Sequence, residues 1–169
     1  MYTVTSGYNP GSKYCRLVIS DPILVQSLIS HGVVEHKTNI ACPPYSIIGS
    51  PFECDCLRGY FDGNGCITMR KPSDSQTLVY TAKICATDTI LNWFKEFAIS
   101  NGVQVNSKPY KRKAYQKVSQ MDIGGSRKAQ AFLDLLYRNA SVYLDRKYER
   151  YLELCKRNIT VELTGNSEC

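Results

Sequence analysis

Residues 56–66 constrain the fold of this chain more than any other segment. They read Cys-Leu-Arg-Gly-Tyr-Phe-Asp-Gly-Asn-Gly-Cys, so an apolar stretch with a glycine in it runs directly into an Asp-Gly-Asn-Gly turn. A helix that packs closely against a second helix needs such a glycine, because a side chain there would push the two backbones apart. A carboxylate at the helix end places an oxygen ligand where the chain bends. The segment therefore predicts a metal-dependent site at the foot of a helix pair.

Residues 57–65 resemble the nine-residue signature of the LAGLIDADG homing endonucleases. Tyr60 and Phe61 fill its two apolar places, and four positions are identical. In the family, the eighth position carries an acidic metal ligand. This chain has Asn64 there, and a neutral carbonyl holds a hard cation such as Mg²⁺ more weakly than a carboxylate does. The identical residues are Leu57, Gly59, Asp62 and Gly65.

The polar and apolar periodicity agrees with the family's order of elements over residues 52–157. The resemblance implies an α+β fold in which helices pack against an antiparallel, saddle-shaped sheet. The last helix is an addition to the family's pattern. We expect helices over 51–62, 87–102, the residues after 124–126, and 144–157, and strands over 66–71, 77–86, 103–107 and 115–122.

Residues 1–50 are interpreted as a partial N-terminal repeat with its connection. A predicted hairpin over 1–8 and 13–19 precedes a helix that ends at Gly32, which repeats the element order of the last third. A truncated two-motif ancestor explains this order, and so does a chance hairpin and helix. The predicted division is 1–50 for the partial repeat, 51–160 for the LAGLIDADG-like domain and 161–169 for a frayed tail.

The resemblance also implies which residues form a site. In the family, two motif helices pack side by side, and each contributes an acid to a shared metal site beneath the DNA. With one motif, this chain needs a homodimer to complete such a site. Turn formation and solvated lysines are the alternatives for these residues. The implied helix-pair interface is Leu57, Gly59, Tyr60 and Gly63; the implied catalytic residues are Asp62, Asn64, Lys147 and Lys37, with Asp62 and a weak Asn64 as metal ligands.

A basic cluster with tyrosines between its members suggests contact with a phosphate backbone through counterion release. The alternative is an ordinary solvated loop. Polar residues on the predicted strands, on the face that reads DNA in the family, are further candidates for contacts to phosphates and bases. The predicted nucleic-acid-binding residues are Arg70, Lys83, Gln104, Asn106, Lys108, Lys111, Arg112, Lys113 and Lys117.

Composition excludes several other classes. The net charge of +6 is modest for a nucleic-acid binder, so the distribution of charge carries more weight than its sum. The eight cysteines form no CxxC pair, which favours free buried thiols over zinc or disulfides. Trp93 is predicted to lie in the core. No apolar run approaches a membrane span, and no signal peptide is recognised, so a cytoplasmic protein is expected, nuclear or organellar in a eukaryote.

The leading hypothesis is a double-stranded DNA-binding protein of the LAGLIDADG type in which Asn64 replaces the metal-ligating acid. The first alternative is an active, Mg²⁺-dependent endonuclease that works as a homodimer. The second is an inactive derivative, carried by a mobile genetic element such as a phage or an intron. That derivative would act as a regulator, or as an inhibitor of a protein partner that handles nucleic acid.

Overall fold

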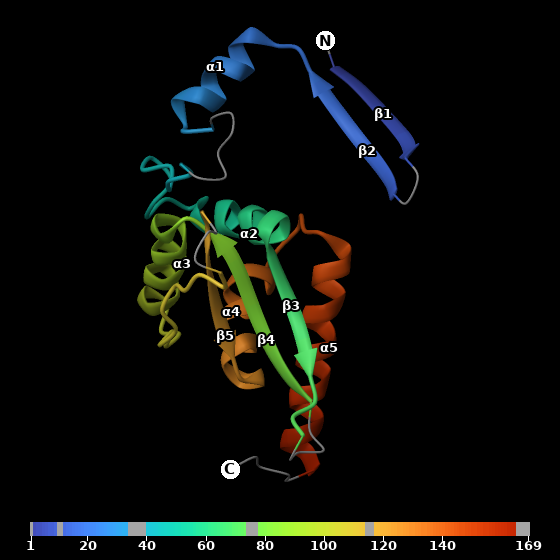
Figure 1. Cartoon of the computed structure of the whole chain (residues 1–169), viewed down its shortest axis with the longest axis vertical. Coiled ribbons are helices and arrows are strands. Elements are labelled where there is room, and N and C mark those ends of the chain that lie inside the picture. The colour runs from blue at the N-terminus through green and yellow to red at the C-terminus, as the bar shows by residue number, and fades with distance from the viewer. Residues whose placement is uncertain (1, 10–11, 34–39, 74–77, 114–116, 165–169) are drawn as a thin grey trace. The chain divides into compact units, whose positions relative to one another are not determined.

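The computed structural model describes residues 2–9, 12–33, 40–73, 78–113 and 117–164 (Figure 1). The chain forms two compact units, residues 1–35 and 36–169. That the first unit is a partial repeat of the second stays a prediction. Lys37 lies outside the described residues.

The first unit is a hairpin followed by a helix. Strands β1 (Tyr2–Asn9) and β2 (Ser12–Ile19) pair antiparallel from Tyr2↔Ile19 to Asn9↔Ser12. Helix α1 (Pro22–Ser30) begins after Asp21, whose carboxylate accepts from the amides of the second and third helical residues. An aspartate cap followed by proline in the first turn is a sequence pattern typical of the start of a helix, and Asp21 and Pro22 form this pattern here. The predicted hairpin and helix are confirmed.

The second unit is an α+β fold whose antiparallel sheet has the strand order β3–β4–β5. The motif helix α2 leads without a loop into the first strand, because Gly65 ends the helix and starts β3. The elements are α2 (Glu53–Asn64), β3 (Gly65–Arg70), β4 (Val79–Ala86), α3 (Asp88–Ser100), β5 (Ser119–Gly124), α4 (Ser126–Tyr137) and α5 (Asp145–Thr164).

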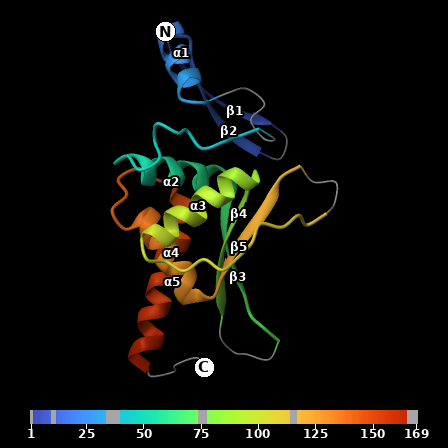
Figure 2. The ribbon, with the colours of Figure 1, turned by 90° about the vertical axis from the view of Figure 1, so that its left-hand side faces the viewer.

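The sheet has one covered and one open face. Along β4, Tyr80, Ala82 and Ile84 are buried, whereas Thr81 and Lys83 between them are more exposed. This alternation with a period of two is what a strand with one solvated face requires. Figure 2 shows the helices gathered on one side of the strands. We call the side that faces away from α3 and α4 the outer face.

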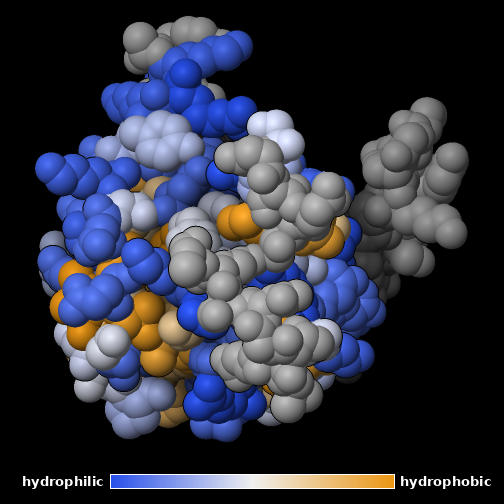
Figure 3. Space-filling model, turned by 90° about the horizontal axis from the view of Figure 1, so that it is seen from below, coloured by the Kyte–Doolittle hydropathy of each residue, from blue (hydrophilic) through white to orange (hydrophobic). Residues whose placement is uncertain are grey.

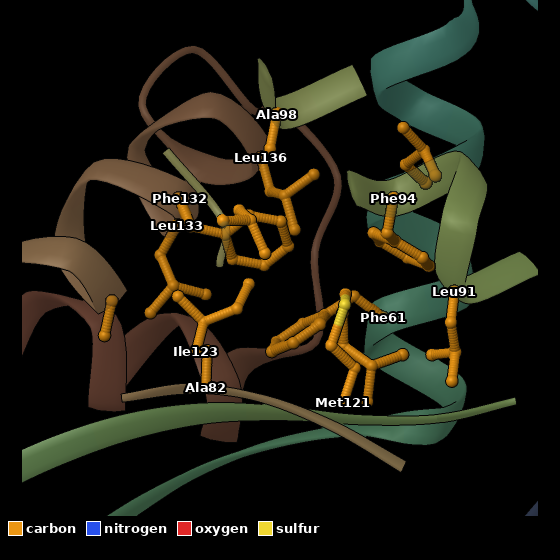
Figure 4. Close-up of a cluster of buried hydrophobic side chains, with 14 of the residues drawn as sticks. Phe61, Ala82, Leu91, Phe94, Ala98, Met121, Ile123, Phe132, Leu133 and Leu136 are labelled. Carbon is orange, nitrogen blue, oxygen red and sulfur yellow. The ribbon is translucent and has the colours of Figure 1, made fainter. Parts of the chain in front are cut away.

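The core lies between the inner face of the sheet and helices α2, α3 and α4 (Figure 4). Phe132 of α4 makes angled ring contacts with Phe61 of α2 and Phe94 of α3, both at 6.2 Å between ring centroids. Such edge-on pairs stabilise a core beyond the apolar area that they bury. Trp93 is 3% exposed, as predicted, and its indole N–H donates to Glu53 Oε1 over 2.7 Å. The motif helix is therefore held along its length by α3 and α4.

The strand predicted over 103–107 is wrong for the residues that the structure describes. The backbone of segment 103–110 pairs with β5 at a single bridge, between Tyr110 and Gln120, as far as the described residues show. Two features prevent a longer ladder. Pro109 lacks an amide hydrogen, and the hydroxyl of Ser107 rather than a backbone amide donates to the carbonyl of Asp122.

Other details differ from expectation as well. The last helix continues to Thr164 instead of ending near residue 157. The six cysteines whose side chains are described are free thiols, as predicted, but three are exposed and three are half-buried, so the prediction of buried thiols is wrong. Among the helices in the described ranges, none is long and apolar enough to cross a membrane. Seen from below the view of Figure 1, the surface outside the grey atoms is mainly hydrophilic, with apolar residues gathered at the lower left (Figure 3).

Candidate nucleic-acid interface and motif-helix site

Asp62 connects the end of the motif helix to the junction between α4 and α5. Its Oδ1 accepts from the hydroxyl of Tyr137 over 2.6 Å, and its Oδ2 accepts from the amide of Leu144 over 2.9 Å. Burial and the Asp62 hydrogen bond raise the pKa of the Tyr137 phenol well above its usual range, so the phenol stays a donor. Both carboxylate oxygens thus have a partner within the chain. Asp62 is thus a hydrogen-bond acceptor at the helix end that joins α2 to the α4–α5 junction.

Lys147 caps the motif helix from α5. Its ammonium donates to the backbone carbonyls of Phe61 and Asp62 over 2.5 and 2.7 Å, and it lies 5.2 Å from the centre of the Phe61 ring. Carbonyls in the last turn of a helix lack helical partners and carry partial negative charge, so a cation there is favourable. Burial and the neighbouring Arg146 lower the pKa of Lys147. With 3% exposure, it is not the solvated lysine of the alternative reading.

The residues at the end of α2 do not fit an Mg²⁺ site within one copy of the chain. Asn64 is exposed at the end of the helix, one turn after Tyr60. Asp62 is the one carboxylate here, and the chain's own donors occupy both its oxygens. Across the described ranges, no group of three or more His, Cys, Asp or Glu side chains could hold a metal ion. Hard divalent cations prefer several charged oxygen ligands.

One face of the motif helix is open. A Cβ placed on Gly59 or Gly63 would meet no heavy atom within 4 Å, so a second helix could approach the backbone there. Leu57 does not belong to this face, because it is fully buried in the core, and its predicted place in the interface is wrong. Tyr60 is only half-buried, with its ring 6.1 Å from that of Phe94.

A hollow of about 390 Å³ adjoins this open face. Arg58 lies on its wall and ties the motif helix to the α4–α5 junction. It donates from Nε to the Val142 carbonyl over 2.8 Å and from Nη1 to the Leu136 carbonyl over 3.2 Å. It also pairs with Asp55 over 2.5 Å. Arg58 was not among the residues predicted from the sequence, although a single arginine inside an apolar helical stretch was the signal. The hollow is lined by Asp55, Arg58, Gly59, Asp62, Ser141, Val142 and Tyr143.

The outer face of the sheet brings some of the predicted nucleic-acid-binding residues together. Lys83 lies at its centre and Arg70 at the far end of β3, and the register puts both on the side away from the helices. The basic cluster, defined as Lys108, Lys111, Arg112, Lys113 and Lys117, is exposed beside β5. Lys111 and Lys117 also line a second hollow at the start of α3. Gln104 and Asn106 are exposed as well, but on the irregular segment 103–110 rather than on a strand.

The outer face also carries a polar network that the sequence analysis missed. Gln120 Nε2 donates to Asp122 Oδ1 over 2.5 Å and to the Tyr110 hydroxyl over 2.9 Å. Tyr110 donates in turn to Asp122 Oδ2 over 3.1 Å. The Lys83 ammonium lies 3.9 Å from the same Oδ2. The alternation of residues within β5 was the available signal, because Gln120 and Asp122 share one face of that strand.

Comparison with known proteins supports the fold. No family model matches this sequence, and no curated protein sequence matches it. The structure resembles that of the LAGLIDADG homing endonuclease I-GzeII in complex with its DNA target, with a TM-score of 0.51 and 11% identity over 68% of this chain. That match spans 38% of the I-GzeII chain. The predicted α+β fold, an antiparallel sheet packed by helices, is confirmed by this likeness, and the observed sheet has three strands.

Two further homing endonucleases match with lower scores. I-CvuI in complex with its target gives a TM-score of 0.44 at 17% identity, over 61% of this chain and 64% of that one. I-TnaI gives 0.44 at 11% identity, over 66% and 74%.

Proposed function

We propose that this chain binds double-stranded DNA with the outer face of its sheet and the adjoining basic cluster, and that it does not cleave the DNA. The observation that carries this proposal is the open, polar outer face, which holds Lys83 and Arg70 and is bordered by the basic cluster. An antiparallel sheet leaves one face uncovered only where that face tolerates water or a polar partner. Cations beside such a face attract phosphates by releasing condensed counterions.

The lack of cleavage is argued from the end of the motif helix. Asn64 replaces the acid that the family signature has at this position, and Asp62 accepts hydrogen bonds from Tyr137 and Leu144. These two bonds fix the orientation of the Asp62 carboxylate towards the α4–α5 junction. Lys147 is engaged with the carbonyls of the same helix end. The side chains here therefore stabilise the junction of α2, α4 and α5 and leave no charged ligand set for a cation.

The proposal includes a symmetric dimer through the open face of α2. Gly59 and Gly63 lie one turn apart on this face and present backbone rather than side chains. In a twofold pair, the same surface of each copy meets the other, so one small-residue face suffices for both partners. The same face supports the second candidate function, a homodimeric Mg²⁺-dependent endonuclease. In that candidate, two copies together would have to supply the ligands that one copy lacks.

Duplex binding can be tested by equilibrium titration at several salt concentrations. Each cation that contacts a phosphate contributes about 0.9 to the slope of log affinity against log salt. The double variant Lys111→Ala, Arg112→Ala is expected to weaken binding to all sequences and to lower the slope by roughly 2. Lys156→Ala, an exposed lysine on α5, is the matched control and should leave the slope unchanged. Absence of duplex binding by the wild type at low salt would contradict the proposal and would favour a protein partner.

Cleavage is tested with the same duplexes in the presence of Mg²⁺ or Mn²⁺. The wild type is expected to bind without cutting. Asn64→Asp restores the acid of the signature, and a gain of cutting in this variant would identify the asparagine as the cause of inactivity. Cutting by the wild type would establish the endonuclease candidate instead.

The dimer is tested by sedimentation, which measures the oligomeric state of the wild type and of Gly59→Leu, a variant whose side chain blocks the open face.

A further inference from the structure

Asp122 is the only carboxylate within strands β3, β4 and β5 as the structure describes them. It lies on the outer face of the edge strand β5, opposite Lys83 of the central strand in the register of β4 and β5. The side chains of Asp122 and Lys83 are 30% and 33% exposed, so a ligand on this face can reach both. An acid weakens attraction to phosphate. Asp122 faces Lys83 across the two strands, and together these side chains present an acceptor and a donor at one place on the outer face.

The hydrogen-bond network fixes what Asp122 can offer. Gln120 donates to both Asp122 and the Tyr110 hydroxyl, and that hydroxyl donates to Asp122. Both amide hydrogens of Gln120 and the phenolic hydrogen of Tyr110 are therefore used inside the network. A carboxylate has about four acceptor positions, and these bonds occupy two of them. The network thus holds Asp122 in one orientation and leaves it as a pure acceptor.

The chemistry of base edges in the major groove determines which base fits. Guanine and thymine present acceptors at the positions that a carboxylate would meet, which excludes them. Adenine offers its amino group beside the N7 acceptor, whereas cytosine offers its N4 amino group without an adjacent acceptor. Lys83, 3.9 Å from the carboxylate, is a donor for the O6 of the guanine paired with that cytosine. An acceptor and a donor side by side match the amino and carbonyl groups that lie side by side on a C·G or an A·T pair, but guanine offers Lys83 two acceptors, O6 and N7, whereas thymine offers only O4, so the pair of side chains favours C·G.

We propose that Asp122 and Lys83, held by Gln120 and Tyr110, read one C·G base pair in the major groove, with Asp122 on cytosine N4 and Lys83 on guanine. This inference rests on the proposed binding of duplex DNA. It adds a specificity-determining residue that the basic cluster cannot provide, because cations on phosphates do not distinguish sequences.

The test is selection of bound duplexes from a randomised library, followed by sequencing, at one fixed salt concentration. The wild type should prefer C·G at one position, or at two symmetric positions if it binds as a dimer. Asp122→Asn, which keeps the shape of the side chain, should reduce that preference by roughly 5- to 150-fold. Lys83→Gln should relax the same position. Glu96→Gln, an exposed acid on α3, removes the same charge as Asp122→Asn and should leave every preference unchanged.

The outcomes separate the two proposals. No duplex binding by the wild type would overturn the proposed function and this inference with it. Duplex binding without a C·G preference at any position would overturn the inference alone. So would an Asp122→Asn variant whose affinity changes equally for all sequences, since that is a charge effect, or Asp122 and Lys83 variants that relax different positions. Far-UV circular dichroism of both variants establishes that they are folded.

Discussion

Replacement of Asp62 by alanine distinguishes a structural carboxylate from a metal ligand. The variant removes the acceptor for the hydroxyl of Tyr137, a fully buried residue, and for the amide of Leu144, which water can reach. An unsatisfied buried donor costs about 1–3 kcal/mol, and a solvated one costs less, roughly 0.5–1 kcal/mol. We therefore expect Asp62→Ala to lower the free energy of unfolding by about 1.5–4 kcal/mol. Asp62→Asn, which keeps one acceptor, should cost about half as much.

The measurement is urea denaturation in metal-free buffer and again with millimolar Mg²⁺. Glu149→Ala, which truncates an exposed carboxylate on α5, is the control and should change stability by less than about 0.5 kcal/mol. A loss below about 0.5 kcal/mol for Asp62→Ala would show that the two hydrogen bonds do not hold the junction. Stabilisation of the wild type by Mg²⁺ that disappears in the variant would restore the metal-ligand reading and refute the argument from geometry.

Two further predictions concern the motif glycines and the buried phenols. Gly65→Ala should destabilise the protein by about 1–3 kcal/mol in urea denaturation, because its Cβ would lie 2.5 Å from the buried Phe61 ring. Gly59→Ala should instead stabilise the monomer by up to about 1 kcal/mol, since its site is open and alanine favours a helix; equal effects at both sites would contradict the packing. Burial and bonds to Asp62 and Asp134 raise the pKa values of Tyr137 and Tyr151 above that of an unfolded tyrosine. The two protonated phenols therefore contribute fully to the free energy of unfolding below about pH 10. Above that pH, the free energy of unfolding should fall by at most about 1.4 kcal/mol per pH unit for each phenol, and Tyr151→Phe should fall less steeply than the wild type.

Much of the fold follows from local patterns in the sequence. The caps at Asp21 and Thr87 and the alternation along β4 are short-range signals, and the elements they predict are present. The missing strand shows the limit of such signals. Segment 103–107 has the alternation of a strand, but whether a ladder forms depends on the chain beside it. Here Pro109 and the hydroxyl of Ser107 decide the outcome, and neither effect can be read from the alternation alone.

The candidate site was less accessible from sequence than the fold. The motif located the helix, but the partners of Asp62 lie more than 70 residues away in the chain, at Tyr137 and Leu144. Burial of Lys147 against the same helix end depends equally on tertiary packing. Leu57 was placed in the helix-pair interface because of its motif position, but it is buried in the core. A motif position alone does not tell which face of the helix is covered. The residue types suggest which side chains could form a site, and the packing around each side chain determines what it can bind or donate to.

The single tryptophan of the chain belongs to the second unit, where Trp93 is buried against the first turn of α2. Its emission therefore reports on residues 36–169 alone, whereas ellipticity at 222 nm records α1 together with the other helices. Superimposable denaturation curves from the two signals would mean that both units melt as one cooperative body. Separated curves would mean that the N-terminal hairpin and helix unfold independently of the second unit, in a transition that the tryptophan emission does not detect.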